Sequence, residues 1–397
     1  MRHLLLAAVL LASLHAAAQD GPYLMPPVEE QVEIDILSSY YEQDGNNSAV
    51  EGGLGTEFLY DISNIIVVNV GWDSVHSINF TGGADYYSSA STDRIDFALS
   101  SASSEDVRGY GTATYTRTNL KRGESYGIQF GGSAEYDYNS ISTGLRYSKQ
   151  SRDANTQLNL AATAYFDRWR IFLPIELRGV AEPSELFDTQ NRRSYNVTAI
   201  LSQVINTRLQ VALAAEAIWQ EGLLSTPFHR VWFADQAFFP GVETLPGERF
   251  KLPVSVRLNY FPTDGLVIRT FYRYYYDDFG ITAHTASLEL PLKLSTAWAV
   301  APFYRYHTQT AADFFAPFGV HTSDQLFFTS DFDLSALSSH NVGVGLRYEP
   351  LYGLARARLP GNRLFNFKAV EARGSYYDRS TGLTAFTASV QLSFRVE

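Results

Sequence analysis

The residues of this chain alternate between apolar and polar over long segments, and this alternation limits the fold more than any other feature. In the last segment every second residue from Phe386 to Val396 is apolar, and the residues between them are polar. Successive side chains of a β-strand point to opposite faces, so such a segment has one apolar and one polar face. The same pattern recurs near residues 209–217, 254–260 and 342–348. It predicts an all-β fold.

Two architectures produce this alternation: a secreted β-sandwich or propeller with its apolar side inward, and a transmembrane barrel with its apolar side toward lipid. The segments are roughly 10–14 residues long, the length that a tilted membrane strand needs, whereas soluble strands average about 5–6. Aromatic residues gather near segment ends, as in 272–276 and 303–306, which is typical of interfacial girdles. We therefore expect a transmembrane antiparallel up-and-down β-barrel, with the secreted all-β domain as the alternative.

The number of strands follows from the segments and the connections between them. Seventeen segments alternate along the chain, but bacterial barrels have even strand numbers with both termini in the periplasm. The sequence of long and short connections changes phase between residues 119 and 193, where four segments lie: 125–137, 141–150, 156–167 and 169–179. We predict about 16 strands within a range of about 14 to 18, with one strand split or missed in that region. Four prolines fall in proposed strands, where a missing N–H is tolerated only at an end: Pro174, Pro253, Pro291 and Pro302.

The connections differ in length. Short turns are expected on the periplasmic side near residues 206–207, 262–264 and 293–295. Long connections are expected on the extracellular side at 180–193, 220–249 and 310–338. Phenylalanine and tryptophan are frequent within 228–239 and 314–328. Loops in water rarely carry so many aromatic residues, so we expect one of the two to fold into or over the lumen as a plug. The alternative is that they extend the strands beyond the membrane.

The start of the chain resembles a secretory signal peptide. Met1-Arg2-His3 supplies a short positive region, residues 4–14 are almost all apolar, and the run Ala16-Ala17-Ala18 matches a cleavage site. We expect cleavage after Ala18, so that residues 1–18 are a signal peptide, 19–31 a short extension and 32–397 a single barrel domain. Because no cysteine follows the apolar stretch, a lipid anchor is excluded. The expected location is the bacterial outer membrane.

Composition and motifs exclude several functions. The chain has no cysteine, so disulfides and thiolate metal sites are ruled out, and its net charge of -11 argues against nucleic acid as a partner. No nucleophile elbow, metalloprotease helix, phosphate loop or dinucleotide-binding motif is present. The histidines beyond the signal peptide have no zinc-ligand spacing. Ser339 and His340 are adjacent and would face opposite sides of a strand. We expect no enzyme, with an outer-membrane hydrolase as a remote alternative.

Arginines lie on the polar faces of the proposed strands. The candidates for the lumen are Arg257, Arg269, Arg273, Arg305, Arg347, Arg373 and Arg395. With acidic neighbours such as Glu289 and Glu371 they would form a charged lining, as in pores whose selectivity depends on rings of charge. The alternative is that the charges pair with one another and close the lumen.

The N-terminal third carries motifs of a known family. The motifs are Asp35–Asn46 (DILSSYYEQDGN), Ser48–Glu57 (SAVEGGLGTE), Asp85–Asp93 (DYYSSASTD) and Ser100–Arg108 (SSASSEDVR). In these motifs the chain resembles the bacterial family catalogued as domain of unknown function 3570. The resemblance implies an outer-membrane-type β-barrel of Gram-negative bacteria and no established activity. It also implies a genomic neighbourhood of thioredoxin-like proteins, small lipoproteins and flavin-attaching enzymes, and hence an extracytoplasmic redox context.

Four carboxylates of this region are weak candidates for a metal site: Asp93, Asp96, Glu105 and Asp106. Clustered carboxylates suit Ca²⁺, which takes oxygen ligands. However, the spacing does not match an EF-hand loop, and Asp and Ser are also the residues of tight turns. Turn or lumen hydrogen bonding is the preferred interpretation, and no other cofactor is expected.

Three functions are compatible with these features. The first is a pore or transport conduit for a small solute in contact with outer-membrane lipid. The second is a plugged barrel that acts as a scaffold or anchor for extracytoplasmic partners, such as a periplasmic protein or a lipoprotein, including redox partners. The third is the outer-membrane hydrolase. Conductance, a co-purifying partner or a converging catalytic constellation would distinguish them.

Overall fold

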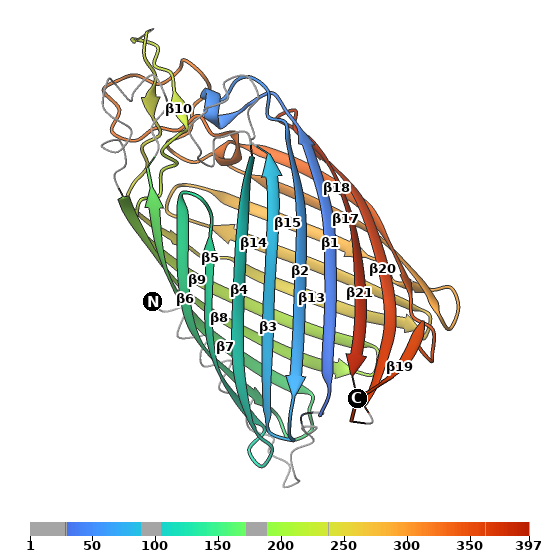
Figure 1. Ribbon diagram of the computed structural model, residues 1–397. Coiled ribbons are helices and arrows are strands. Elements are labelled where there is room, and N and C mark those ends of the chain that lie inside the picture. Colours follow the sequence, from blue (N-terminus) through green and yellow to red (C-terminus); the bar gives the residue numbers. More distant parts are fainter. Residues whose placement is uncertain are drawn as a thin grey trace.

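The alternating segments form one antiparallel sheet that closes on itself (Figure 1). The computed structural model describes residues 28, 30–88, 105–171, 189–236, 238–361 and 363–396. Closure comes from the pairing of the first strand with the last, in which Val32 lies opposite Val396 and Asp44 opposite Thr384. The result is an all-β closed barrel.

Sixteen strands cross the barrel wall within the described residues. Twelve of them between the N-terminus and β17 are β1 (Val32–Asp44), β2 (Leu59–Gly71), β3 (His76–Ser88), β4 (Glu105–Asn119), β5 (Glu124–Ala134), β6 (Tyr138–Gln150), β7 (Thr156–Arg170), β8 (Thr189–Asn206), β9 (Leu209–Gly222), β12 (Glu248–Lys251) continued by β13 (Val254–Thr263), β14 (Leu266–Tyr276), and β15 (Thr282–Glu289) continued by β16 (Leu292–Lys293). The other four are β17 (Trp298–Gln309), β18 (Leu337–Tyr348), β20 (Arg363–Arg379) and β21 (Thr384–Val396).

Smaller elements lie in the connections. They are η1 (Ala49–Glu51), the ribbon of β10 (Arg230–Val231) and β11 (Gly241–Val242), η4 (Phe332–Leu334), and β19 (Ala355–Leu359), which pairs with the start of β20. Among the described residues, no helix has the length and apolar content needed to cross a membrane.

The predicted strand number is confirmed, and so is the region of the miscount. The segment 156–167 and the start of 169–179 belong to one strand, β7, which runs without interruption to Arg170. Most of the second segment, with Pro174, lies outside the described residues. Pro253 and Pro291 fall between β12 and β13 and between β15 and β16, so each proline breaks the ladder locally without adding a strand.

The two ends of the barrel differ. The turns predicted near 206–207, 262–264 and 293–295 are short and lie at the end that also holds the last residues of β21 (Figure 1). The opposite end carries the connections 45–58, 223–247 and 310–336. The remaining predicted long connection, 180–193, lies largely outside the described residues, because β8 begins at Thr189. The long connections 45–58, 223–247 and 310–336 and the three short turns therefore lie at opposite ends, as predicted. The rule is not general, because 135–137, 277–281 and 380–383 are short connections at the same end as the long ones, and the connection between β18 and β20 is long at the other end.

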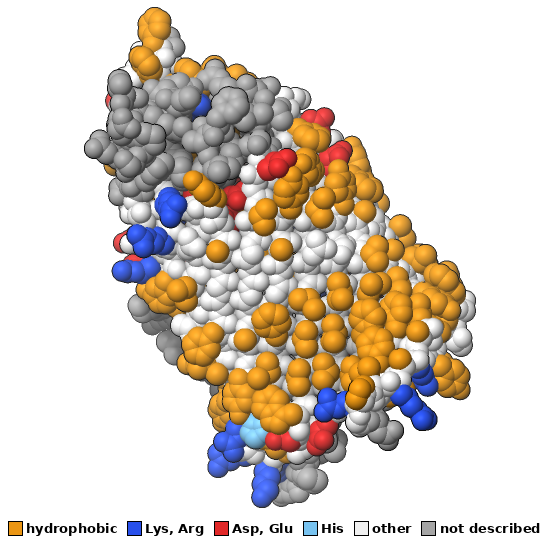
Figure 2. All heavy atoms as spheres, in the orientation of Figure 1, with side chains coloured by type: hydrophobic (Ala, Val, Ile, Leu, Met, Phe, Trp, Pro, Cys, Tyr) orange, Lys and Arg blue, Asp and Glu red, His pale blue; other side chains and the backbone are white. Residues whose placement is uncertain are grey.

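The pairing register separates an apolar outer face from a polar inner face. On the outer face, Phe130, Ile141 and Leu145 have 58%, 69% and 65% of their surface exposed. Figure 2 shows hydrophobic side chains over the barrel wall, with most charged ones toward its two ends. Few apolar residues are buried in the wall itself. Instead, a small hydrophobic core lies among the connections at the end opposite the short turns and contains Leu245, Phe279, Ile281 and Ala312.

Candidate functional site

One side of the lumen is lined by a chain of ion pairs. Glu289 on β15 contacts Arg269 on β14 at 3.2 Å and also contacts Arg373 on β20. Glu371 contacts Arg373 at 2.8 Å and Arg347 on β18 at 3.2 Å. The contact between β20 and β15 passes over β17 and β18, which is possible only on the concave side of the wall. These groups therefore face the interior.

Two glycines of β18 make room for this arrangement. A Cβ on Gly345 would lie 3.1 Å from Nε of Arg373, and a Cβ on Gly343 would lie 2.4 Å from Cζ of Phe303. The Arg373 guanidinium lies 5.5 Å from the centre of the Phe303 ring, a distance at which cation–π attraction operates. Side chains from β17 and β20 thus lie across β18 at Gly343 and Gly345, which carry no side chain of their own.

The register puts all seven candidate arginines on this inner face, but they fall into two groups. Four form ion pairs with carboxylates: Arg269, Arg347, Arg373 and Arg395. The other three form no ion pair with any described residue: Arg257, Arg273 and Arg305. These three, which we call the arginine patch, lie on β13, β14 and β17.

The members of the arginine patch are close in the sheet. Arg257 pairs with Phe271, Phe271 with Ser287, and Ser287 with Arg305, so these four residues form one row across four strands. Arg273 lies two residues along β14 from Phe271, on the same face. The Arg257 guanidinium is 5.7 Å from the centre of the Phe271 ring. The row therefore concentrates positive charge that carboxylates of the described wall do not neutralise.

The opposite side of the lumen is lined by hydroxyl and amide groups. The inner residues of β4–β8 that carry such groups include Thr112, Thr114, Thr116, Ser125, Gln129, Ser140, Ser142, Ser148, Asn159, Thr163, Thr198 and Ser202. A cavity of about 330 Å³ lies against them, bordered by Thr116, Ser125, Arg146, Ser148, Asn159 and Thr198. Arg146 donates to the Gln129 side chain with Nε at 3.0 Å. This side offers hydrogen bonds with little charge.

The connections at one end join across the mouth of the barrel. Arg230 Nη1 donates to the Val50 carbonyl at 2.7 Å, and Trp232 Nε1 donates to the Glu51 carbonyl at 3.2 Å. The two connections involved follow β1 and β9, which are eight strands apart in the ring of sixteen. We call the connections 45–58, 223–247, 277–281 and 310–336 the cap.

Aromatic rings hold the cap together. Phe279, only 1% exposed, packs edge-on against Phe314 with ring centres 5.5 Å apart. Phe233 packs in the same way against Phe328 at 5.0 Å. Both aromatic-rich segments of the sequence therefore lie in the cap, where they contact each other.

Arg379, at the end of β20, is 5% exposed and links the cap to the barrel. Its guanidinium lies 2.5 Å from Asp333 and 3.7 Å from Glu57. Burial raises the pKa of the Glu57 carboxyl to about 7, although Arg379 acts in the opposite direction. Glu57 is therefore a titratable group of the cap near neutral pH.

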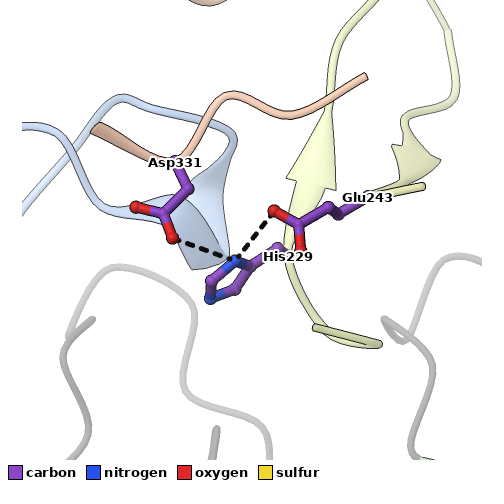
Figure 3. A group of neighbouring side chains, drawn as sticks. All are labelled: His229, Glu243 and Asp331. Carbon is purple, nitrogen blue, oxygen red and sulfur yellow. Dashed lines mark ion pairs between the residues drawn. The ribbon is translucent and has the colours of Figure 1, made fainter. Parts of the chain in front are cut away.

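The cap also contains a histidine between two carboxylates (Figure 3). His229 Nδ1 lies 3.6 Å from Glu243 and 3.8 Å from Asp331. Burial acts to lower the pKa of the His229 imidazole, but Glu243 and Asp331 outweigh it and the pKa is raised. Burial also acts on the carboxylates: it raises the pKa of Asp331 to about 6, whereas at Glu243 the contacts with His229 dominate and the pKa is lowered.

The sequence-predicted metal candidates are only partly described. Asp93 and Asp96 lie outside the described residues, and Glu105 and Asp106 begin β4. Asp106 meets Glu135 and Asp137, with ligand oxygens within 4.8 Å of one another. Sequence reasoning missed Glu135 and Asp137.

These two residues belong to the short connection after β5, and the pairing of β4 with β5 brings that connection to the start of β4. Glu135 accepts a hydrogen bond from Tyr87 at 3.1 Å and lies 3.5 Å from Arg108. The carboxylates therefore have protein partners.

Ser339 and His340 lie on opposite faces of β18. His340 Nδ1 is 2.7 Å from the Tyr304 hydroxyl on the outer face, and Ser339 is 4% exposed. The two side chains do not meet.

A family model described as "Protein of unknown function (DUF3570)" matches residues 3–354. No curated protein sequence matches the chain. Among solved structures, the siderophore receptor PirA from Acinetobacter baumannii has a TM-score of 0.45 and 10% identity over 88% of this chain and 53% of that one. A bacterial polysaccharide outer membrane secretin has a TM-score of 0.48 and 9% identity over 93% and 99%. The outer membrane protein opdK from Pseudomonas aeruginosa has a TM-score of 0.42 and 8% identity over 92% and 99%. The chain spans about half the length of the siderophore receptor.

Proposed function

The chain belongs to the DUF3570 family of proteins of unknown function, and we propose that it is an outer-membrane barrel that conducts a small anionic solute. The proposal has two parts, the location of the barrel in a membrane and the sign of the charge that its lumen accepts. It assigns no catalytic chemistry to the chain.

The membrane location is supported by the outer face of the barrel. Large apolar side chains on this face are exposed on many strands, among them Ile141 at 69% and Val342 at 56%. Soluble proteins rarely expose apolar patches of more than a few hundred Å², and a belt of this kind around a closed barrel is what lipid stabilises. The signal-like start of the sequence adds export from the cytoplasm, and hence the outer membrane of a Gram-negative bacterium.

The arginine patch is the observation that carries the choice of an anion. Guanidinium groups remain charged at any physiological pH, and Arg257, Arg273 and Arg305 have no carboxylate partner among the described residues. Unneutralised charge on a narrow, low-dielectric wall concentrates counter-ions and excludes ions of the same sign. The paired arginines on the same wall contribute much less to anion preference, because the carboxylates beside them cancel their positive charge.

Conductance in a planar bilayer tests the proposal. The detergent-refolded chain, verified by heat-modifiable gel migration, is inserted between two KCl concentrations, and the reversal potential is measured. We expect preference for chloride over potassium, and loss of most of that preference when Arg257, Arg273 and Arg305 are all replaced by Gln. Arg117→Gln, which removes one charge from the outer face, is the control and leaves selectivity unchanged. Cation preference in the wild type would contradict the proposal.

The cap favours a second candidate, a closed barrel that serves as a scaffold for extracytoplasmic partners. Its bonds join opposite sides of the mouth, through Arg230 and Trp232. If folded wild-type protein shows no conductance but the double variant Arg230→Ala with Trp232→Ala conducts, the cap is a closed gate. If neither conducts, the scaffold function replaces the conduit.

A further inference from the structure

Three side chains of the cap converge from two separate connections without forming hydrogen bonds to one another. His229 and Glu243 belong to the connection 223–247, and Asp331 belongs to the connection 310–336 (Figure 3). Their nearest ligand atoms all lie within 4.8 Å of one another. The distances from His229 Nδ1, 3.6 and 3.8 Å, exceed the range of a hydrogen bond.

The imidazole nitrogen at the centre is buried and unsatisfied. His229 Nδ1 has no hydrogen-bond partner among the described residues, while the side chain as a whole is 15% exposed and that of Glu243 only 3%. A buried polar atom without a partner is costly, since it has given up its bonds to water. Glu243 and Asp331 place two carboxylates around this nitrogen, where a positive charge is needed to compensate them.

The carboxylates are held in place by the surrounding backbone and hydroxyls. Glu243 accepts from the Thr226 backbone N–H at 2.7 Å and from the Thr329 hydroxyl at 2.5 Å. Asp331 Oδ1 accepts from the Asp333 backbone N–H at 2.9 Å, which leaves its Oδ2 directed at His229. Such outer contacts are the kind that orient metal ligands. The three groups are therefore preorganised around one point.

We propose that His229, Glu243 and Asp331 bind a single divalent transition-metal ion, of which Zn²⁺ is the representative. One imidazole and two carboxylates are ligands of Zn²⁺ and similar ions, whereas all-oxygen sets suit Ca²⁺ and Mg²⁺. Ligand atoms held tetrahedrally at about 2.0–2.1 Å from Zn²⁺ are about 3.4 Å apart, close to the 3.6 and 3.8 Å that separate His229 Nδ1 from the two carboxylates. A fourth position remains for water or another donor.

The ion would lock the cap. It would cross-link the connection after β9 to the connection after β17, and the first of these is already bound to the connection after β1 through Arg230 and Val50. Because a metal that binds only the closed arrangement stabilises that arrangement by mass action, removal of the ion would loosen the cap. This inference does not depend on conduction by the lumen.

Cobalt titration of the detergent-refolded, EDTA-treated full chain tests the site. Co²⁺ is added as the chloride, and its visible absorption reports coordination by nitrogen and oxygen in place of water. We expect one Co²⁺ per chain, displaced by Zn²⁺. His229→Gln and Asp331→Asn each weaken binding at least about 100-fold, since they remove a ligand rather than an outer contact. His340→Gln, a histidine on the outer wall, is the matched control and binds as the wild type does.

Two results would overturn the proposal. The first is the absence of stoichiometric Co²⁺ or Zn²⁺ binding by folded wild-type protein, which would leave the trio as an ion pair with protonated histidine. The second is stoichiometric binding that both substitutions leave intact, which would put the ion elsewhere. Gel migration identifies a variant that has not folded. Asp331 lies in a loop and is 22% exposed, so Asp331→Asn disturbs folding less than His229→Gln does. The loss of metal binding can therefore be measured in Asp331→Asn even if His229→Gln does not fold.

Discussion

The two sides of the lumen achieve a polar surface in different ways. The wall from β13 to β20 uses long charged side chains that reach over their neighbours, as Arg373 reaches Glu289. The wall from β4 to β8 uses short hydroxyl and amide groups, such as Thr118, which lies 3.2 Å from the Ser125 hydroxyl. The lumen cavity of about 330 Å³ lies against the neutral wall. A lumen built this way has charge on one side and room on the other.

The largest effect on stability is expected on the charged wall. Glu371→Gln removes the carboxylate shared by Arg347 and Arg373, and leaves both guanidinium groups short of a partner. We expect a loss of about 2 kcal/mol in unfolding free energy, less than breaking a fully buried pair costs, because both arginines are 40% exposed and water screens the pairs in part. We also expect a shift toward anion permeation. Denaturant unfolding and reversal potential measure the two effects.

The matched control for this variant is Glu349→Gln. Among the described residues, Glu349 forms an ion pair with Arg347 alone, and it is 43% exposed, so the pair is screened by solvent and worth about 0–1 kcal/mol. Equal losses for the two variants would show that the network has no special role in stability.

A pair of glycine substitutions compares the space on the two walls. Gly343→Ala puts a Cβ 2.4 Å from the Phe303 ring and 2.5 Å from the Gly374 carbonyl, so backbone must move. We expect a loss of about 1–3 kcal/mol, the usual range for overpacking. Gly127→Ala on the neutral wall meets its nearest atoms only at 3.3 Å and should cost less than about 1 kcal/mol. Thermal unfolding of both variants checks the difference, and a reversed order would contradict the comparison.

Stability is expected to depend on pH through a residue of the cap, Glu57, rather than through either wall of the lumen. The pKa of Glu57 is raised to about 7 in the folded protein from an ordinary value of 4.5. Between these values the folded state binds more protons than the unfolded state, so Glu57 contributes stability that is present below about pH 4.5 and is lost as the pH rises through about 7. We expect about 1 kcal/mol of lost stability over this window. Glu57→Gln should remove this part of the dependence, and an unchanged pH profile in the variant would show that other groups cause it.

The smallest effect on stability is expected in the cavity. Ala161 faces it from β7, and Ala161→Leu adds apolar volume to open space, so unfolding free energy should change by less than about 0.5 kcal/mol. Conductance should fall while ion selectivity stays constant, because no charge is altered. A change of selectivity would mean that the neutral wall also selects ions.

The sequence predicted the architecture because alternation is a local property. The apolar series from Phe386 to Val396 and the parity of the connections were sufficient for an all-β barrel of about sixteen strands. The extra segment was counted because the alternation continues in the sequence past Arg170, the last residue of β7.

The sites could not be predicted in the same way, since they depend on contacts between distant residues. His229, Glu243 and Asp331 have no zinc-ligand spacing in sequence, and the cap alone brings them together. Likewise, the polar face identified the lumen arginines as a set. It did not separate Arg305, which forms no ion pair with described residues, from Arg373, which does. The partners of Arg373 are Glu289, three strands away, and Glu371, two residues away on the same strand.

Closure of the barrel through β1 and β21 has a consequence for how the chain folds. Val32 and Val396 are neighbours in space but lie at opposite ends of the described chain. Pairing them requires the closure of a very large loop, whose entropy cost is met only after the intervening strands have formed. Until then, both edges of the sheet are open templates for other chains. Pairing of β21 with β1 therefore removes the edges through which the folding chain could aggregate. Loss of residues 384–396 would leave a sheet with two unpaired edges, those of β1 and β20.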